Sequence, residues 1–213
     1  MLKWFDENQR IFPWREDRAT KYQQIVSEIL LQRTKAETVA KYYDTFFSKF
    51  PDWNALANAS LEELEEIMKP LGLYRHRARR LYKLGEDIRR RGGRIPGDEN
   101  ELRDSGFIGL YVTNAFELFI LRNRKPLLDV NMSRLLKRYF KPGDFIDVRH
   151  DKEIQELAND IIEVRRCKEL NWAILDYAAL VCKNRNPLCG ECVLNKHCKY
   201  YELSQGDVTE ESE

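Results

Sequence analysis

Four cysteines in one short segment near the C-terminus are the residues best suited to metal chemistry. They are Cys182, Cys189, Cys192 and Cys198, with the spacing C-x6-C-x2-C-x5-C. In a cytosolic chain such a cluster indicates metal binding rather than disulfides. Four thiolates can hold one zinc ion or a cubane [4Fe–4S] cluster. Structural zinc usually takes two separated short pairs, whereas this pattern has one pair flanked by single cysteines, so the spacing favours iron–sulfur and leaves zinc as the alternative.

A second group of residues with chemical potential lies between residues 105 and 134. Gly106 and Gly109 can adopt backbone angles that are closed to other residues, so the amides between them can turn toward a phosphate. Asp129 follows Gly109 by twenty residues and precedes a run with helical character. An acid at that point lies near a helix N-terminus.

A third candidate is a glutamate within a long helical pattern. Apolar residues recur at helical spacing over residues 22–50, and Glu28 and Gln32 lie four apart within it, so they share one helix face. Burial of the carboxyl beside Ile25 and Ile29 would raise its pKa and let it carry a proton near neutral pH. An exposed glutamate is the simpler interpretation of the spacing alone.

The elements that must position these side chains are short helices joined by short turns. Residues 22–50 predict one or two of them, and Ser60 with Glu63 has the pattern of a capping box at the start of another. Residues 75–91 predict a further helix that ends at a glycine pair, and a short one follows at about residues 98–104. Strand signals are nearly absent, so the fold class is predicted to be all-α.

Length and charge restrict the class of protein further. A chain of 213 residues with 43% apolar residues can bury a real core. The net charge is only +1, but residues 202–213 carry acids and no Lys or Arg, so the rest of the chain is more positive. Residues 75–94 are rich in Lys and Arg, which suits a phosphate-facing surface or simply a solvated helix face. No apolar window is long enough for a membrane span or a signal peptide, which predicts a cytoplasmic protein.

Taken together, the cysteine spacing, the glycine hairpin followed by an acid, and the segments FPWR and SEILLQRT resemble the helix-hairpin-helix DNA glycosylases of the endonuclease III superfamily. The resemblance covers about residues 4–201 and is strongest to T/G mismatch-specific thymine glycosylases, then to A/G-specific adenine glycosylases. It implies two interleaved helical subdomains, namely a six-helix barrel with the helix-hairpin-helix over residues 17–122 and an iron–sulfur cluster domain over residues 1–16 and 123–201. Residues 202–213 would form an acidic, disordered tail.

The resemblance assigns catalytic roles to three residues. Asp129 falls on the family's catalytic aspartate, which stabilises the sugar cation as the glycosidic bond breaks or helps position a water. Glu28 matches a glutamate with which adenine glycosylases protonate the leaving base, and the similar thymine enzymes have it too. Tyr111 lies where bifunctional members have a lysine that attacks the sugar. Because tyrosine cannot form a Schiff base, monofunctional cleavage is expected.

The resemblance also implies DNA contacts at the end of the Glu28 helix. Gln32 occupies the position of a residue that inserts into the base stack where the target base has been extruded. Extrusion is required because the glycosidic bond is shielded within the duplex. Arg33 can hydrogen-bond the widowed partner base, since arginine suits guanine edges. A surface salt bridge is the plain alternative for Arg33.

The hairpin itself departs from the family pattern. Relatives generally read L-P-G-V-G where this chain has Ser105-Gly106-Phe107-Ile108-Gly109. Phe107 therefore replaces the first hairpin glycine, and it either inserts toward DNA or packs under the loop. Gly106, Phe107 and Gly109 are placed with the DNA-binding residues, as is Asn131.

The resemblance predicts a monofunctional DNA glycosylase that hydrolyses the N-glycosidic bond of thymine or uracil opposite guanine after the base is flipped out of the duplex. The chain stops shortly after the last cysteine, which disfavours an adenine glycosylase with its additional C-terminal domain. An adenine glycosylase acting on A opposite G or 8-oxoguanine stays the alternative, as does a non-catalytic iron–sulfur DNA-binding module. The expected partner is double-stranded DNA with a mismatched or damaged base, bound by a monomer at the nucleoid and not at a membrane.

Overall fold

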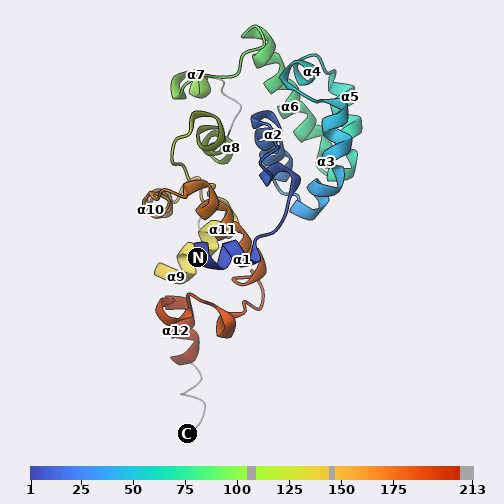
Figure 1. Cartoon of the computed structure of the whole chain (residues 1–213). Coiled ribbons are helices and arrows are strands. Elements are labelled where there is room, and N and C mark those ends of the chain that lie inside the picture. The colour runs from blue at the N-terminus through green and yellow to red at the C-terminus, as the bar shows by residue number, and fades with distance from the viewer. Residues whose placement is uncertain (105–108, 144–146, 207–213) are drawn as a thin grey trace. The chain divides into compact units, whose positions relative to one another are not determined.

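The computed structural model describes residues 1–104, 109–143 and 147–206, and every regular element in these ranges is helical (Figure 1). The predicted all-α class is therefore confirmed. The chain divides into two compact units, a central unit of Ile11–Asn123 and a terminal unit of Met1–Arg10 with Arg124–Glu213. None of the described helices combines the length and the apolar character that a bilayer crossing requires.

The central unit is a bundle of helices around an aromatic core. Tyr22, Phe47 and Trp53 pack edge to face with ring centroids 4.7–5.6 Å apart, and the Tyr22 hydroxyl donates to the carbonyl of Phe50. In chain order its helices are α2 (Lys21–Leu31), α3 (Ala36–Lys49), α4 (Trp53–Ala57), α5 (Leu61–Met68), α6 (Tyr74–Arg90), α7 (Glu99–Asp104) and α8 (Leu110–Phe116), with 3-10 turns at Pro13–Arg15 and Lys69–Leu71.

Local capping signals explain where two of these helices begin. The hydroxyl of Ser60 accepts from the backbone N–H of Glu63, whose carboxylate accepts from the N–H of Ser60, so the predicted capping box of α5 is confirmed. Thr20 and Gln23 make the same reciprocal pair at the start of α2, the helix that carries Glu28.

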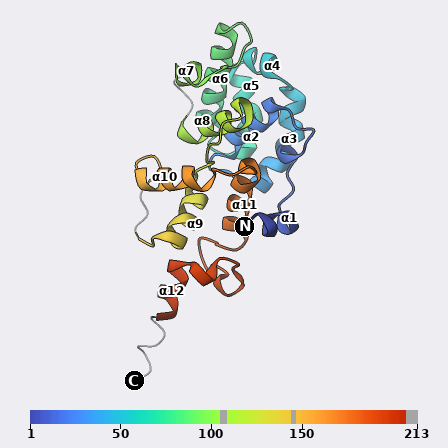
Figure 2. The same ribbon diagram turned by 60° about the vertical axis from the view of Figure 1, so that its left-hand side comes forward.

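Helix α6 lies against α4 and α5 and supplies the basic face of the central unit (Figures 1 and 2). Its buried side includes Leu81, Leu84 and Ile88, whereas Arg79 and Arg80 are exposed. Gly85 is required at the crossing, because a Cβ there would lie 2.8 Å from the carbonyl oxygen of Leu56 in α4. The core thus fixes which arginines of α6 face solvent.

One segment of the central unit departs from regular α-helical geometry. Helix α8 ends at Phe116 and continues as one wide π-helical turn, Glu117–Leu121, which stops at Arg122 with φ 65°. The side chain of Asn123 donates to the buried carboxylate of Glu117 at 3.3 Å. Single π-turns of this kind are rare and cannot be recognised from apolar periodicity.

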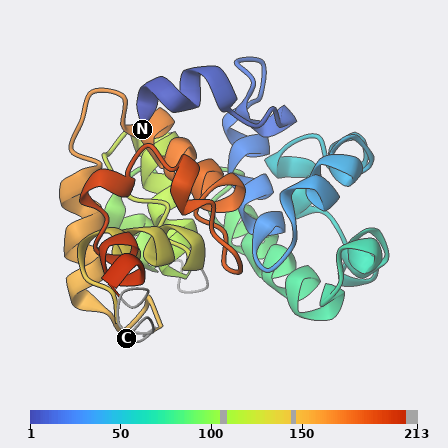
Figure 3. The same ribbon diagram turned by 90° about the horizontal axis from the view of Figure 1, so that it is seen from below.

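The terminal unit is built around α11 (Cys167–Leu180), which is buried on most of its surface. Helix α1 (Leu2–Asn8) packs on α11 although the two lie at opposite ends of the chain, as Figures 1 and 2 show. Arg10 fixes this N-terminal segment through a 2.8 Å ion pair with Asp176, whose side chain is fully buried. Helices α9 (Val130–Phe140) and α10 (Lys152–Ile161) complete the core, and α12 (Lys199–Gly206) lies against α9 (Figure 3).

Candidate active site and metal centre

The central unit brings two predicted catalytic side chains together. Glu28 on α2 is only 3% exposed, and the hydroxyl of Tyr111 on α8 donates to its Oε2 at 2.7 Å. Helices α2 and α8 pack against each other, which positions the pair. The interpretation of Glu28 as an exposed surface residue is therefore wrong. A carboxyl removed from water next to a phenol has the environment in which a side chain can hold or release a proton.

Gln32, four residues further, ends α2 and is held by two arginines of α6. The backbone carbonyl of Gln32 accepts from the guanidinium of Arg77, which is 5% exposed, and its side-chain oxygen accepts from Arg80 at 2.6 Å. Arg77 also donates to the carbonyl of Leu71, so it links two turns. The basic helix is thus connected directly to the end of the helix that carries Glu28.

Arg33 follows in an unusual backbone conformation. Its φ is 59°, in the left-handed region, which costs a non-glycine residue about 1–2 kcal/mol. The side chain is exposed. Strained residues that persist on a protein surface are often held for a functional reason. The turn of residues 32–34 therefore presents a cation beside the exposed arginines of α6.

The structure describes only part of the predicted hairpin. Gly106 and Phe107 lie outside the described residues. Gly109 is the N-cap of α8 with φ −76° and ψ 163°, a conformation open to any residue. A Cβ at this position would meet nothing within 4 Å. Gly109 therefore does not adopt the special backbone angle that was predicted for it. Its Cα instead leaves open space beside the N-terminus of α8.

Asp129 in the terminal unit is the N-cap of α9, as the sequence predicted. Its Oδ1 accepts from the backbone N–H groups of Asn131 and Met132, both at 2.8 Å, and its Oδ2 accepts from the Asn131 side chain at 2.7 Å. Burial raises the pKa of Asp129 above its ordinary value, while these hydrogen bonds and the charge of Arg134 act in the opposite direction. The carboxylate is thus held in one orientation and is easier to protonate than a free aspartate.

Two residues that the sequence reasoning missed support Asp129. Arg134, one turn along α9, donates to the side chain of Asn131 at 3.0 Å and to the backbone carbonyls of Ala178 and Cys182. Asn171 is fully buried on α11 and accepts from the backbone N–H of Leu127 at 2.6 Å. The only sequence signal was that Arg134 lies three residues after Asn131, on the same helix face.

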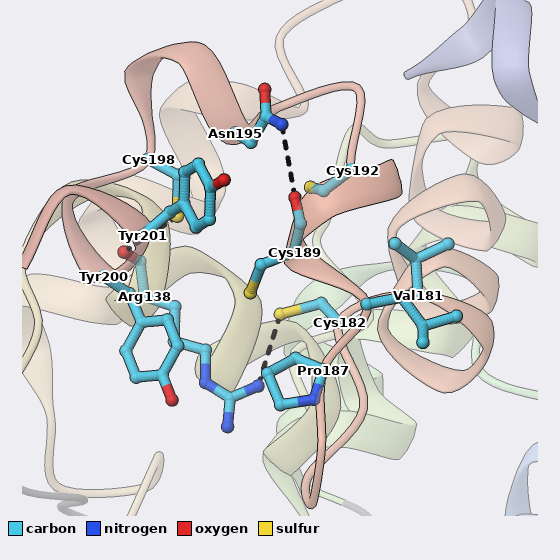
Figure 4. Close-up of a pocket in the computed structure, with 11 residues that line it drawn as sticks. Arg138, Val181, Cys182, Pro187, Cys189, Cys192, Asn195, Cys198, Tyr200 and Tyr201 are labelled. Atoms are coloured by element: carbon cyan, nitrogen blue, oxygen red, sulfur yellow. Dashed lines mark hydrogen bonds between the residues drawn. The ribbon is translucent and has the colours of Figure 1, made fainter. Parts of the chain in front are cut away.

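The four cysteines named above line one pocket of the terminal unit (Figure 4). The rest of the pocket is lined by three apolar residues, two tyrosines and two polar side chains. These are Val181, Pro187, Leu188, Tyr200, Tyr201, Arg138 and Asn195. Within the described ranges, no three His, Cys, Asp or Glu side chains are grouped as a metal ion would require. The fifth cysteine, Cys167, is buried in the core.

Polar groups of α9 and α11 contact three of the four sulfurs, and in one of these contacts Sγ of Cys198 lies 3.4 Å from the backbone carbonyl oxygen of Arg138. Arg138 on α9 donates to Sγ of Cys182 at 3.5 Å and to the carbonyl of Lys183 at 2.6 Å, and its guanidinium lies over the ring of Tyr200. The hydroxyl of Tyr177 lies 3.1 Å from Sγ of Cys192. Hydrogen bonds to sulfur are typical of thiolate ligands, so the chemistry of these residues fits a sulfur-ligated metal group, although the described cysteines are not grouped as a single metal ion requires.

Comparison with known proteins gives matches over most of the chain. Residues 26–174 match the model of the HhH-GPD superfamily of base excision DNA repair proteins. A thymine/uracil-DNA glycosylase of Methanothermobacter thermautotrophicus is 31% identical over 95% of this chain and 91% of its own length. The adenine DNA glycosylase of Mus musculus is 31% identical over 96% of this chain but only 42% of its own length. The solved structure of a thermostable thymine-DNA glycosylase superposes with a TM-score of 0.85 at 31% identity, over 95% of this chain and 93% of that one.

Proposed function

The chain belongs to the HhH-GPD superfamily of base excision DNA repair proteins, and on that premise we propose that it is a monofunctional DNA glycosylase that removes thymine or uracil opposite guanine. The observation that carries the proposal is the buried Glu28–Tyr111 pair in a chain that also holds Asp129 in a fixed orientation. Such groups can supply the proton transfer and the charge stabilisation by which a protein accelerates hydrolysis of an N-glycosidic bond.

Hydrolysis breaks the bond between the base and C1′ of the sugar. The base leaves with the bonding electron pair and takes up a proton, while water adds to the sugar carbon and loses one. Asp129, when ionised, stabilises the positive charge that develops on the sugar or orients the water. Glu28 is placed to exchange the proton because it is buried and hydrogen-bonded to a phenol.

Tyr111 restricts the reaction to base release. A lysine amine at this position would attack the sugar carbon and hold it as a Schiff base, which leads to strand cleavage. The phenol of Tyr111 has no such chemistry, and its hydroxyl is already engaged with Glu28. The product is therefore an abasic site in an intact strand.

Two observations support thymine or uracil as the base. The thymine/uracil-DNA glycosylase matches this chain over nearly its whole length, whereas the adenine enzyme has more than half of its length outside the match. The structural match at a TM-score of 0.85 is also a thymine-DNA glycosylase. An adenine glycosylase is the second candidate, because the mouse enzyme is equally identical over the shared region.

The proposal includes a [4Fe–4S] cluster held by Cys182, Cys189, Cys192 and Cys198. A cubane cluster takes four sulfur ligands, and the position of these four cysteines in the lining of one pocket supports the proposal. A bound cluster would link the four cysteines and so restrict the motion of the loop that carries them. Lys183, Arg185 and Lys196 on the same loop would then be held in place to meet DNA phosphates. Zinc in place of iron stays the alternative for the same thiols.

A panel of duplexes tests the function. Purified protein is incubated with T·G, U·G, A·G and A·8-oxoguanine duplexes, and the released base is identified. We expect release of thymine and uracil only, with strand breakage appearing only after alkali. Asp129→Asn should bind the T·G duplex and release no base. Release of adenine alone would favour the second candidate, and binding without any release would leave a non-catalytic DNA-binding module.

The cofactor is tested on the same preparation. We expect a yellow-brown protein with four iron atoms per chain, as a [4Fe–4S] cluster requires. Substitution of Cys192 by Ser should reduce the iron content, whereas substitution of the core residue Cys167 should not. A colourless protein that contains one zinc per chain would contradict the iron–sulfur proposal.

A further inference from the structure

Tyr177 contacts a predicted ligand sulfur from the most buried helix of the terminal unit. Its side chain is fully buried on α11, and its Oη lies 3.1 Å from Sγ of Cys192 and 2.8 Å from the backbone nitrogen of Val193. Both contacts fall on consecutive residues of the loop that carries the cysteines. The hydroxyl is therefore directed at one ligand of the pocket.

The direction of these two hydrogen bonds follows from the number of protons. The backbone N–H of Val193 can only donate, so Tyr177 Oη accepts there and has its own hydrogen left to donate. That hydrogen points to Sγ of Cys192. A thiolate is a much stronger acceptor than a thiol, because hydrogen bonds to ionised groups are stronger. The arrangement thus gives Sγ of Cys192 a hydrogen-bond donor that is held by the backbone of the next residue.

Packing fixes the tyrosine ring in this orientation. The indole of Trp4 on α1 contacts the ring edge to face, with centroids 4.7 Å apart and an interplanar angle of 78°. Cys182, in contrast, receives a longer contact of 3.5 Å from the partly exposed guanidinium of Arg138. The sulfurs of the pocket therefore have different surroundings, and the hydroxyl contact on Cys192 is shorter and more deeply buried.

We propose that Tyr177 is a positioning residue that sets the reduction potential of the bound cluster through its O–H···S hydrogen bond to Cys192. The inference rests on the [4Fe–4S] cofactor of the proposed function. A donor directed at a ligand sulfur draws negative charge from it and so stabilises the cluster form with one more electron. Removal of the donor makes that form less stable, which lowers the potential.

The test compares Tyr177→Phe with wild type in the full chain. The midpoint potential is measured by potentiometric titration of the iron-loaded protein, followed by visible absorption. We expect the potential of Tyr177→Phe to fall, up to a tenfold change in the one-electron equilibrium constant, or about 59 mV. Tyr201→Phe removes a hydroxyl from the lining of the same pocket and is expected to keep the wild-type potential.

The possible results distinguish a failure of the role proposed for Tyr177 from a failure of the [4Fe–4S] proposal. An unchanged potential in iron-loaded Tyr177→Phe overturns the role of Tyr177 and leaves the cluster in place. Wild-type protein that binds zinc instead of iron overturns the cofactor and the inference together. If Tyr177→Phe retains no cluster, Tyr177→His restores a donor at this position. Cluster retention by the histidine variant then supports the inference, and cluster loss in both variants overturns it.

Discussion

The phenol of Tyr111 on α8 donates its hydrogen to Oε2 of Glu28 on α2 over 2.7 Å, although the two residues lie 83 positions apart in the sequence. One group is nearly excluded from solvent and the other is half-buried. The two side chains therefore form one hydrogen-bonded unit, and we expect the orientation of the Glu28 carboxyl to depend on Tyr111.

Substitution of Tyr111 by Phe tests that dependence. The variant keeps the ring and removes the donor that faces a buried carboxyl, a loss of about 1–3 kcal/mol. We expect base release from a T·G duplex to slow by roughly 10- to 100-fold with duplex affinity unchanged, measured under single-turnover conditions. Tyr82→Phe on α6 is the matched control. An unchanged rate in Tyr111→Phe would show that the Glu28 carboxyl needs no support from the phenol.

Local signals account for what the sequence predicted correctly. The capping box at Ser60 and the start of α9 at Asp129 depend on contacts within three residues, which can be recognised without a tertiary structure. The position of α6 was predicted from a long stretch without helix breakers that ends at a glycine pair. Both glycines, Gly92 and Gly93, have positive φ. The sequence therefore predicted the elements and the residues at their ends.

Long-range contacts account for what the sequence did not predict. The partners of Gln32 on α6 are 45 and 48 residues away, and Arg134 reaches carbonyls 44 and 48 residues away. Neither pairing has a periodicity that could have indicated it. The burial of Glu28 likewise depends on α8, since the spacing within α2 alone favoured an exposed carboxyl.

Asp129 is expected to give a pH-dependent stability. Its pKa is higher in the folded protein than the ordinary value of 3.8, because burial disfavours the charged form. A carboxyl of this kind favours folding while it is protonated, and that contribution is lost as the pH rises through the raised pKa. Asn at this position still caps α9 but cannot ionise.

Asp129→Asn should therefore gain stability relative to wild type as the pH rises from below 3.8 through the raised pKa of Asp129. The measurement is the denaturant midpoint of both proteins across that range, at fixed salt. Asp151→Asn is an informative contrast, because Lys137 holds the pKa of Asp151 below its ordinary value and its substitution should become more costly as the pH rises. A stability difference for Asp129→Asn that does not change with pH would contradict the raised pKa.

Arg80 is expected to affect base release beyond its contribution of charge. It holds the side chain of Gln32 at 2.6 Å, whereas its exposed neighbour Arg79 supplies the same charge from the same helix turn. Arg80→Met and Arg79→Met should weaken duplex binding similarly and reduce its salt dependence similarly. Only Arg80→Met should slow thymine release from bound duplex, by about fivefold, as for loss of roughly 1 kcal/mol.

The discriminating measurement for Arg80 is the single-turnover rate at saturating protein, because it excludes differences in affinity. Arg80→Lys keeps the charge but replaces the planar guanidinium with a point charge, so it should restore binding more fully than the rate. Equal rates for Arg80→Met and Arg79→Met would mean that the contact with Gln32 has no role in the reaction.

Asn171 is expected to contribute both to the free energy of unfolding and to the position of Asp129. Its Oδ1 accepts from the N–H of Leu127, and its Nδ2 donates to the carbonyls of Lys125 and Cys167, so one buried amide orders the segment that leads to Asp129. Asn171→Ala leaves these backbone groups without the amide, at about 1–3 kcal/mol for a buried unsatisfied group. Asn159→Ala, an exposed helical asparagine, should change the free energy of unfolding by less than about 0.5 kcal/mol.

The effect of Asn171→Ala on base release separates its two roles. At a temperature where both variants remain folded by circular dichroism, a purely stabilising asparagine would leave the rate of base release at the wild-type value. We expect instead a rate reduced by about tenfold or more, because a shift of Asp129 by a fraction of an ångström misplaces the carboxylate relative to the sugar. Normal activity in folded Asn171→Ala would show that α9 and its cap position Asp129 without help from α11.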